Sequence, residues 1–215
     1  MQGRFRLGYD ALMGMSIRQL GKHETAAFER VLAIYREAIE PSEQRPEADL
    51  RGVIGREDYL VLVAERDAGI VGFAISWLPD GEDFWLFEYV AATPAERGKG
   101  TGAALLRQSA SAAGADRTGL VEADAARDDV TARRLGFYER LGCRPLHGLD
   151  YQLPLRTHGL PPPMLLLALT PASAVSRDAV GRWLRRLYVG VYGQLADDPR
   201  ITQMLAALPP DVRLV

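Results

Sequence analysis

The chain has 215 residues, of which 25% are charged and 47% hydrophobic, and its formal net charge is −2. These values are ordinary for a soluble globular protein with one domain, or with one domain and an extension. A charge so close to zero does not point to a nucleic acid or an anionic membrane as a partner. Cys143 is the only cysteine, which excludes an intramolecular disulfide and zinc sites built from several cysteines.

The sequence gives no sign of a metal site or a membrane-spanning segment. His23, His147 and His158 are scattered and match no metal-ligand spacing, so we expect no metal. The first residues lack the continuous apolar core of a signal peptide, and the apolar stretch 161–169 is too short to span a bilayer. We therefore expect a cytoplasmic protein with neither a membrane nor a nucleic acid as its partner.

The first part of the chain predicts a strand and two helical segments. Residues 15–20 resemble a short strand, and residues 24–39 place apolar side chains at helical spacing until Pro41 ends the pattern. Residues 43–56 are polar and have a weaker helical pattern.

A β meander comes next. Strands are predicted over residues 59–65, 70–78 and 84–92, and the short turns around Gly69 and Gly81 imply that neighbouring strands are antiparallel. The elements predicted after the meander are a helix over 100–113, a strand over 119–125, a helix over 131–141 stopped by Gly142, and strands over 143–153 and 164–170.

The character of the sequence changes after Pro171. Residues 176–196 carry one apolar helical face, for which Ser176 or Asp178 is a candidate N-cap, and a short helix over 201–208 follows. A Trp/Tyr/Leu face of this length must be buried. We expect it either to pack on its own domain or to form a homodimer interface. The face consists of Val180, Trp183, Leu184, Leu187, Tyr188, Val191, Tyr192 and Leu195.

The segment RGKGTG, residues 97–102, lies between the strand over 84–92 and the helix over 100–113. Amides at a helix start have no intrahelical acceptor, and glycines let that backbone approach a ligand closely. A strand, a glycine-rich loop and a helix in this order predict a diphosphate cradle, with Arg97 and Lys99 adding charge at its rim. The segment lacks the Gly-Lys-Ser/Thr ending of a P-loop and matches the dinucleotide fingerprint G-x-G-x-x-G only in part.

RGKGTG resembles motif A, R/Q-x-x-G-x-G/A, of the GNAT superfamily of N-acetyltransferases, and FYERLGC, residues 137–143, is similar to a second signature of that family. The order of predicted elements also matches, and the resemblance covers about residues 15–170. It implies an α/β (α+β) fold: a mixed, mostly antiparallel, twisted sheet of about seven strands flanked by helices. The expected organisation is a GNAT domain over residues 1–170, of a bacterial small-molecule type, and a helical extension over 171–215.

The resemblance implies acetyl-CoA as the cosubstrate, with no metal. In the family, the strand before motif A splays from its neighbour through a β-bulge, and its amides bind the acetyl carbonyl and the pantetheine arm. The amide of Val90 or Ala91 would then be the donor to the carbonyl oxygen. The predicted coenzyme-binding residues are Val90, Ala91, Ala92, Arg97, Gly98, Lys99, Gly100, Thr101, Gly102 and Asp129.

Two residues are candidates for proton transfer. Glu88 lies among apolar and aromatic residues on the strand over 84–92, where the family often carries a general base, although an ion pair with an arginine is the alternative role. Tyr138 matches the family tyrosine that protonates the coenzyme A sulfur, and a core aromatic is the alternative. Asp129 stands near the position where many members carry an Asn that contacts the pantetheine, and an Asp there changes the hydrogen-bond donors.

The remaining candidates concern the acceptor and the mechanism. Trp77 and Trp85 are candidate walls of an apolar acceptor site, and Cys143 is expected to be a small buried residue rather than an acyl carrier. The resemblance implies transfer of acetyl from acetyl-CoA to a primary amine of a small molecule by direct attack in a ternary complex. A non-catalytic acyl-CoA-binding module and a protein or peptide N-acetyltransferase are the alternatives. Acidic residues that could attract a cationic amine are Glu40, Glu43, Glu47 and Asp49.

Overall fold

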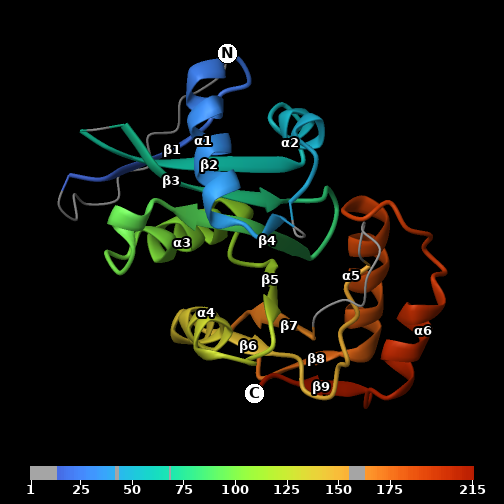
Figure 1. The fold of residues 1–215 in the computed structure, drawn as a ribbon. Coiled ribbons are helices and arrows are strands. Elements are labelled where there is room, and N and C mark those ends of the chain that lie inside the picture. Colours follow the sequence, from blue (N-terminus) through green and yellow to red (C-terminus); the bar gives the residue numbers. More distant parts are fainter. Residues whose placement is uncertain (1–13, 42–43, 68, 155–162) are drawn as a thin grey trace. The chain divides into compact units, whose positions relative to one another are not determined.

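A computed structural model describes residues 14–41, 44–67, 69–154 and 163–215 of the chain (Figure 1). The chain divides into two compact units, Met1–Arg117 and Thr118–Val215, and each is described by itself. Glu43 and most of the proline-rich connector before the last predicted sheet strand lie outside the described residues.

The first unit is an antiparallel meander with helices. Each of the strands β1 to β4 pairs with the next strand along the chain in antiparallel orientation. The elements are β1 (Ser16–Gln19), α1 (Thr25–Ala38), α2 (Glu47–Val53), β2 (Tyr59–Arg66), β3 (Gly69–Trp77), β4 (Phe84–Ala92), the short 3-10 helix η2 (Pro94–Glu96) and α3 (Thr101–Ala113).

Helices α1 and α3 cover opposite faces of this meander. The ring of Tyr35 on α1 lies 6.2 Å from the ring of Phe73 on β3. A Cβ atom on the adjacent residue, Gly72, would meet the methyl group of Thr101 on α3 at 3.0 Å. Because consecutive strand residues point to opposite faces, the two helices pack on different sides of β3. Gly72 thus lets α3 approach the sheet closely at the point where the helix begins.

The second unit combines a three-stranded antiparallel sheet with helices and a small ribbon. Strand β7 pairs with both β5 and β6, and β8 pairs with β9. The elements are β5 (Thr118–Asp124), α4 (Asp129–Arg140), β6 (Cys143–Pro145), β7 (Met164–Leu169), β8 (Ala174–Ser176), α5 (Arg177–Gly190), α6 (Pro199–Ala206) and β9 (Asp211–Arg213).

The C-terminal helix is present but shorter than the sequence predicts. Helix α5 begins after Ser176, whose side chain caps it by accepting a hydrogen bond from the amide of Ala179 at 3.1 Å. Gly193 adopts the left-handed conformation just beyond the helix end, so the periodic pattern does not continue to residue 196, and Leu195 is 74% exposed. The rest of the apolar face is buried or half-buried within the chain.

The predicted fold class is confirmed. The described residues contain the seven sheet strands, four in the first unit and three in the second, with helices beside them. The prediction of a strand over 143–153 is wrong after Pro145, because proline lacks a donor and Gly148 turns the chain with a positive φ. The ribbon of β8 and β9 was not predicted. The boundary between residues 170 and 171 stays a prediction.

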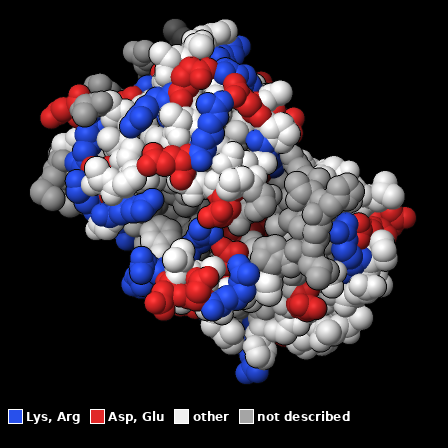
Figure 2. All heavy atoms as spheres, in the orientation of Figure 1, with Lys and Arg blue, Asp and Glu red and all other residues white. Residues whose placement is uncertain are grey.

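None of the described helices is long and apolar enough to cross a membrane. On the face shown in Figure 2, basic and acidic side chains alternate, so the described residues there form no continuous surface of one sign.

Candidate functional site

The glycine loop presents the open start of a helix. Gly98 and Gly100 have φ angles of +77° and +82°, a region that side-chain-bearing residues rarely adopt. Gly100 is the N-cap of α3, and no side chain caps this helix start. A Cβ atom on either glycine would meet no other atom within 4 Å. The start of α3 is therefore neither capped by a side chain nor crowded at these two glycines, an arrangement that suits a phosphate group.

A buried carboxylate directly before the loop holds it in place. The side chain of Glu96 is 5% exposed and accepts hydrogen bonds from Arg66 at 3.0 Å, Lys99 at 3.2 Å and Thr101 at 3.1 Å. The hydrogen bond from Arg66 is the largest cause that holds the pKa of Glu96 below its usual value. Lys99, expected at the rim of the cradle, is therefore paired with Glu96, although its side chain is 55% exposed. The sequence analysis missed Glu96, whose one signal is an acidic residue beside a basic loop.

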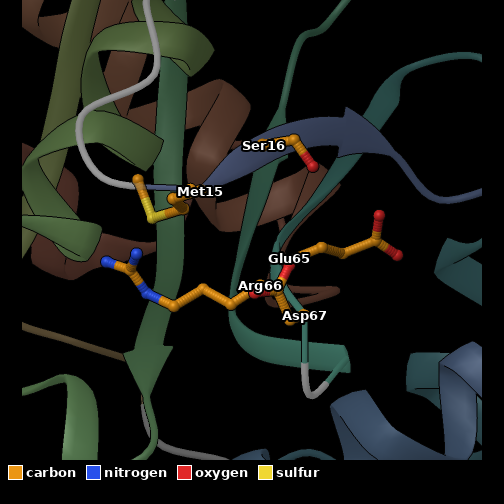
Figure 3. Close-up of a pocket in the computed structure, with 6 residues that line it drawn as sticks. Met15, Ser16, Glu65, Arg66 and Asp67 are labelled. Atoms are coloured by element: carbon orange, nitrogen blue, oxygen red, sulfur yellow. The ribbon is translucent and has the colours of Figure 1, made fainter.

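The loop is also tied to the first strands of its unit. A pocket of about 410 Å³ is lined by Gly14, Met15, Ser16, Glu65, Arg66 and Asp67. Figure 3 shows the side chains of Met15 and Arg66 extending to one side of it and that of Glu65 to the other. The Met15 sulfur accepts a hydrogen bond from Thr101 at 3.6 Å, while Arg66 reaches Glu96. The first contact connects the residue before β1 to the start of α3, and the second connects β2 to η2.

The expected bulge is present in β4, at Glu88. Tyr89 pairs with Ile75 of β3 and Phe87 pairs with Ser76, so Glu88 is the additional residue of β4 between two consecutive positions of β3. A bulge bends a strand and changes the direction of a side chain. Here it places an ionisable side chain two residues before the predicted coenzyme-binding segment.

The amides of that segment point in alternating directions. The amide of Thr93 donates to the carbonyl of Val71, on the β3 side, at 2.8 Å. Because alternate residues of a strand direct their amides to the same side, the amide of Ala91 also points toward β3. Those of Val90 and Ala92 point away from β3. Of the two donors considered for the acetyl carbonyl, the register therefore favours Val90 over Ala91.

Glu88 forms a buried ion pair with Arg45. The Arg45 side chain is 9% exposed and that of Glu88 is 5% exposed, and Nη2 of Arg45 contacts Oε1 of Glu88. Arg45 lies between α1 and α2 and precedes Pro46, which favours the extended backbone that Arg45 needs to reach the sheet. The ion-pair role considered for Glu88 is thus present.

Three tyrosines complete the surroundings of this pair. The amide of Arg45 donates to the hydroxyl of Tyr35 at 2.8 Å, and its Nη1 donates to the hydroxyl of Tyr59 at 3.5 Å. Burial, followed by the negative charge of Glu88, raises the pKa of Tyr59 to about 12 and that of Tyr89 further. The pKa of Tyr35 is also raised, chiefly by burial. All three therefore stay protonated near neutral pH. The sequence analysis named none of them and missed Arg45.

The other two predicted site residues lie in the second unit. Tyr138 on α4 is 8% exposed, and its ring lies 5.0 Å from that of Phe137, which is half-buried. Burial is the main cause that raises the pKa of Tyr138, so the hydroxyl keeps its proton at neutral pH. Asp129 is the first residue of α4 and is exposed, whereas Asp128 caps the helix through the amides of Val130 and Thr131.

Several acceptor-site expectations are not supported. Trp77 and Trp85 are 2% and 1% exposed, so they are core residues rather than walls of an open site. Trp77 donates to Asp58 at 2.9 Å. Glu47 is engaged by Arg36 and Arg51 and so is not a free charge for an amine.

The remaining reactive side chains have plain structural positions. Cys143 is fully buried, and burial raises its pKa to about 12, which agrees with an unreactive core thiol. His147 is exposed, as expected. Within the described ranges, no three His, Cys, Asp or Glu side chains are grouped so as to hold a metal ion.

Residues 57–144 match the family model described as the acetyltransferase (GNAT) domain. No curated protein matches the chain significantly. A solved structure from Bacteroides thetaiotaomicron, assigned to the GNAT acetyltransferases, is 22% identical with a TM-score of 0.70, and the match covers 82% of this chain and 98% of that one.

Two further solved structures have named substrates. The ribosomal-protein-S18-alanine N-acetyltransferase of Escherichia coli is 20% identical with a TM-score of 0.55, and the match covers 74% of this chain and 96% of that one. An aminoglycoside acetyltransferase from an uncultured soil metagenomic sample is 26% identical with a TM-score of 0.52, covering 66% and 99% of the two chains. These likenesses support the fold and leave the acceptor open.

Proposed function

The chain belongs to the GNAT acetyltransferase superfamily, and from this premise we propose that it transfers an acetyl group from acetyl-CoA to a primary amine of a small molecule. One observation carries the proposal: the bulged strand β4 leads directly into a loop with two left-handed glycines and the uncapped start of α3. The strand offers amides for a thioester, and the helix start offers amides for a diphosphate, in the chain order that acetyl-CoA requires.

The residues of the loop fit a diphosphate. The positive φ angles of Gly98 and Gly100 expose the backbone, and the space where their side chains would stand is open. The amides of Thr101, Gly102 and Ala103 would donate to the phosphate oxygens, aided by the helix dipole. Arg97 is exposed, so its charge is available at the rim.

The transfer needs a base, a donor to the carbonyl oxygen and an acid. Glu88 would accept the proton of the attacking ammonium, directly or through a water molecule. The Val90 amide would donate to the thioester oxygen as negative charge develops on it. The amine nitrogen would bond to the acetyl carbon, the carbon–sulfur bond would break, and Tyr138 would give its proton to the leaving thiolate. The nitrogen loses its second proton as the amide forms, and that proton would restore the Tyr138 hydroxyl. Burial raises the pKa of Tyr138, so its hydroxyl carries a proton at neutral pH.

Both acceptor classes occur among the similar structures. One is named as an aminoglycoside acetyltransferase and another as a ribosomal-protein-S18-alanine N-acetyltransferase. The assay should therefore contain both acceptor classes.

The test is release of free coenzyme A by the pure 215-residue chain. Acetyl-CoA is incubated with a panel of small amines and of peptides, the thiol is measured, and the product is identified by its mass. We expect at least one small amine to raise thiol release above the rate without amine and to gain one acetyl group. Acetylation of peptides alone would establish a protein acceptor instead.

Two variants separate catalysis from binding. Glu88→Gln should lower kcat by roughly 10²- to 10⁴-fold, the usual contribution of a general base, while acetyl-CoA still binds. Coenzyme binding without turnover on any amine would favour the non-catalytic acyl-CoA-binding module.

A further inference from the structure

The ion pair between Arg45 and Glu88 raises a question about the proposed base. A carboxylate is a base only when it is ionised, and Glu88 has a side chain that is just 5% exposed. Burial disfavours a charged carboxylate because it removes the hydration of the charge. An opposite charge in contact offsets that cost. Arg45 supplies this charge from a part of the chain far from Glu88 in sequence.

Among the described residues, one arginine and three tyrosines from different parts of the first unit act on Glu88. They are Arg45 from the loop before α2, Tyr35 from α1, Tyr59 from β2 and Tyr89 from β4, all of which interact electrostatically with the carboxylate. The tyrosines are neutral over the working pH range. Arg45 is therefore the one positive charge in this set.

Arg45 is held in place both through its backbone and through its guanidinium group. Its amide donates to Tyr35, its guanidinium donates to Tyr59, and the loop before it is anchored where the Gln44 side chain donates to the carbonyl of Ile39 at 2.7 Å. These contacts fix the guanidinium beside the bulge of β4. An arginine fork held in this way defines the orientation of a carboxylate as well as its charge.

We propose that Arg45 is a positioning residue of the transfer reaction, which keeps Glu88 ionised and oriented at the β4 bulge so that it can accept the proton of the acceptor amine. This inference rests on the proposed function and extends it to the loop between α1 and α2. Without Arg45, the buried carboxylate would stay protonated up to a higher pH than in the wild type, and while it is protonated it cannot act as a base.

The test is the pH dependence of kcat/KM for one acceptor amine. In Arg45→Met, the acidic limb should move to higher pH by roughly 1 to 3 units, the size of effect that an adjacent opposite charge has on a carboxylate. Arg45→Lys keeps a positive charge and should restore most of that shift. Every variant is assayed with the same amine, so the titration of the amine affects all the pH profiles equally and does not account for a difference between them.

A merely structural Arg45 would give a different result. Arg45→Met would then lower kcat/KM by the same factor at every pH and leave the limb in place, which would overturn the inference. Arg18→Met is the matched control, since Arg18 also pairs with glutamates of the first unit but on β1, and its profile should match that of the wild type. If Arg45→Met does not fold, Arg45→Gln, which retains a donor for Tyr59, is judged by the same criterion.

Glu88→Gln separates the proposed role of Arg45 from the proposed role of Glu88 as the base. Loss of the limb in Glu88→Gln, with an unmoved limb in Arg45→Met, would refute the role of Arg45 alone. A wild-type rate and profile in Glu88→Gln would remove the proposed base, and the role of Arg45 with it.

Discussion

Gly100 offers the sharpest test of the coenzyme cradle, through the pair Gly100→Ala and Gly100→Asp. The φ of Gly100 is +82°, and a Cβ atom there would meet nothing within 4 Å. The cost of Gly100→Ala is therefore backbone strain without a clash, about 1–2 kcal/mol in the free energy of unfolding. Aspartate tolerates the left-handed region better than alanine, so Gly100→Asp should be the less strained variant.

The effect on coenzyme binding should have the opposite order. An aspartate at the start of α3 would place a carboxylate beside the diphosphate. At a separation of about 4 Å and an effective dielectric constant of about 20, the repulsion is about 4 kcal/mol. That weakens binding by about 1,000-fold. Gly100→Ala adds no charge and should weaken binding far less.

Calorimetric titration with acetyl-CoA measures the affinity, and urea unfolding measures the stability. Gly81→Asp is the matched control. Gly81 also has a positive φ, +72°, and a Cβ atom there would meet nothing within 4 Å, but it lies before β4, whereas the cradle lies after β4. It should bind acetyl-CoA as the wild type does. A Gly100→Asp protein that is folded and binds acetyl-CoA with wild-type affinity would refute the cradle.

Four other changes test separate parts of the account. Tyr138→Phe should lower kcat and leave acetyl-CoA affinity nearly intact, and a wild-type rate would remove its role as the acid. Cys143→Ala should retain turnover, because burial raises the pKa of this thiol to about 12, and loss of turnover would favour an acyl-cysteine route. Ser176→Ala removes the cap of α5 and should lower the free energy of unfolding by about 1 kcal/mol in urea, so an unchanged value would contradict the cap. Hydrogen bonds from Thr131 hold the pKa of Asp128 below its usual value. The stability that Asp128 contributes is therefore complete above about pH 4 and is lost as the pH falls through the lower pKa of the folded state. Asp128→Asn should reduce this loss of stability in acid, and parallel curves of stability against pH for the variant and the wild type would refute the role of Asp128.

Local patterns account for the parts of the fold that were predicted well. The strand over 84–92 and the helix after the glycine loop have the expected bounds, to within a residue, because alternation, turn residues and glycines act over a few positions. The end of α5 was misjudged because apolar spacing continues past Gly190, while Gly193 reverses the backbone. Periodicity reports which residues are buried and does not report where a helix stops.

The site was predictable only where a residue acts through the backbone or a motif. Glu88 and the loop glycines belong to local patterns that one stretch of sequence displays. Arg45 does not, since its partner lies on a strand far along the chain, and nothing nearby in the sequence distinguishes this buried arginine from the arginines on the surface. Glu96 is similar, because its importance comes from Arg66 on β2. Long-range ion pairs depend on tertiary packing, which a single sequence does not encode in any short window.

The measurement that tests the central claim most directly is calorimetric titration of the wild-type chain with acetyl-CoA and with free coenzyme A. The account predicts micromolar binding of acetyl-CoA to the cradle formed by residues 97–102. Absence of binding of either molecule to the folded protein would contradict it, and the roles proposed for Glu88, Val90 and Tyr138 would fall with the cradle.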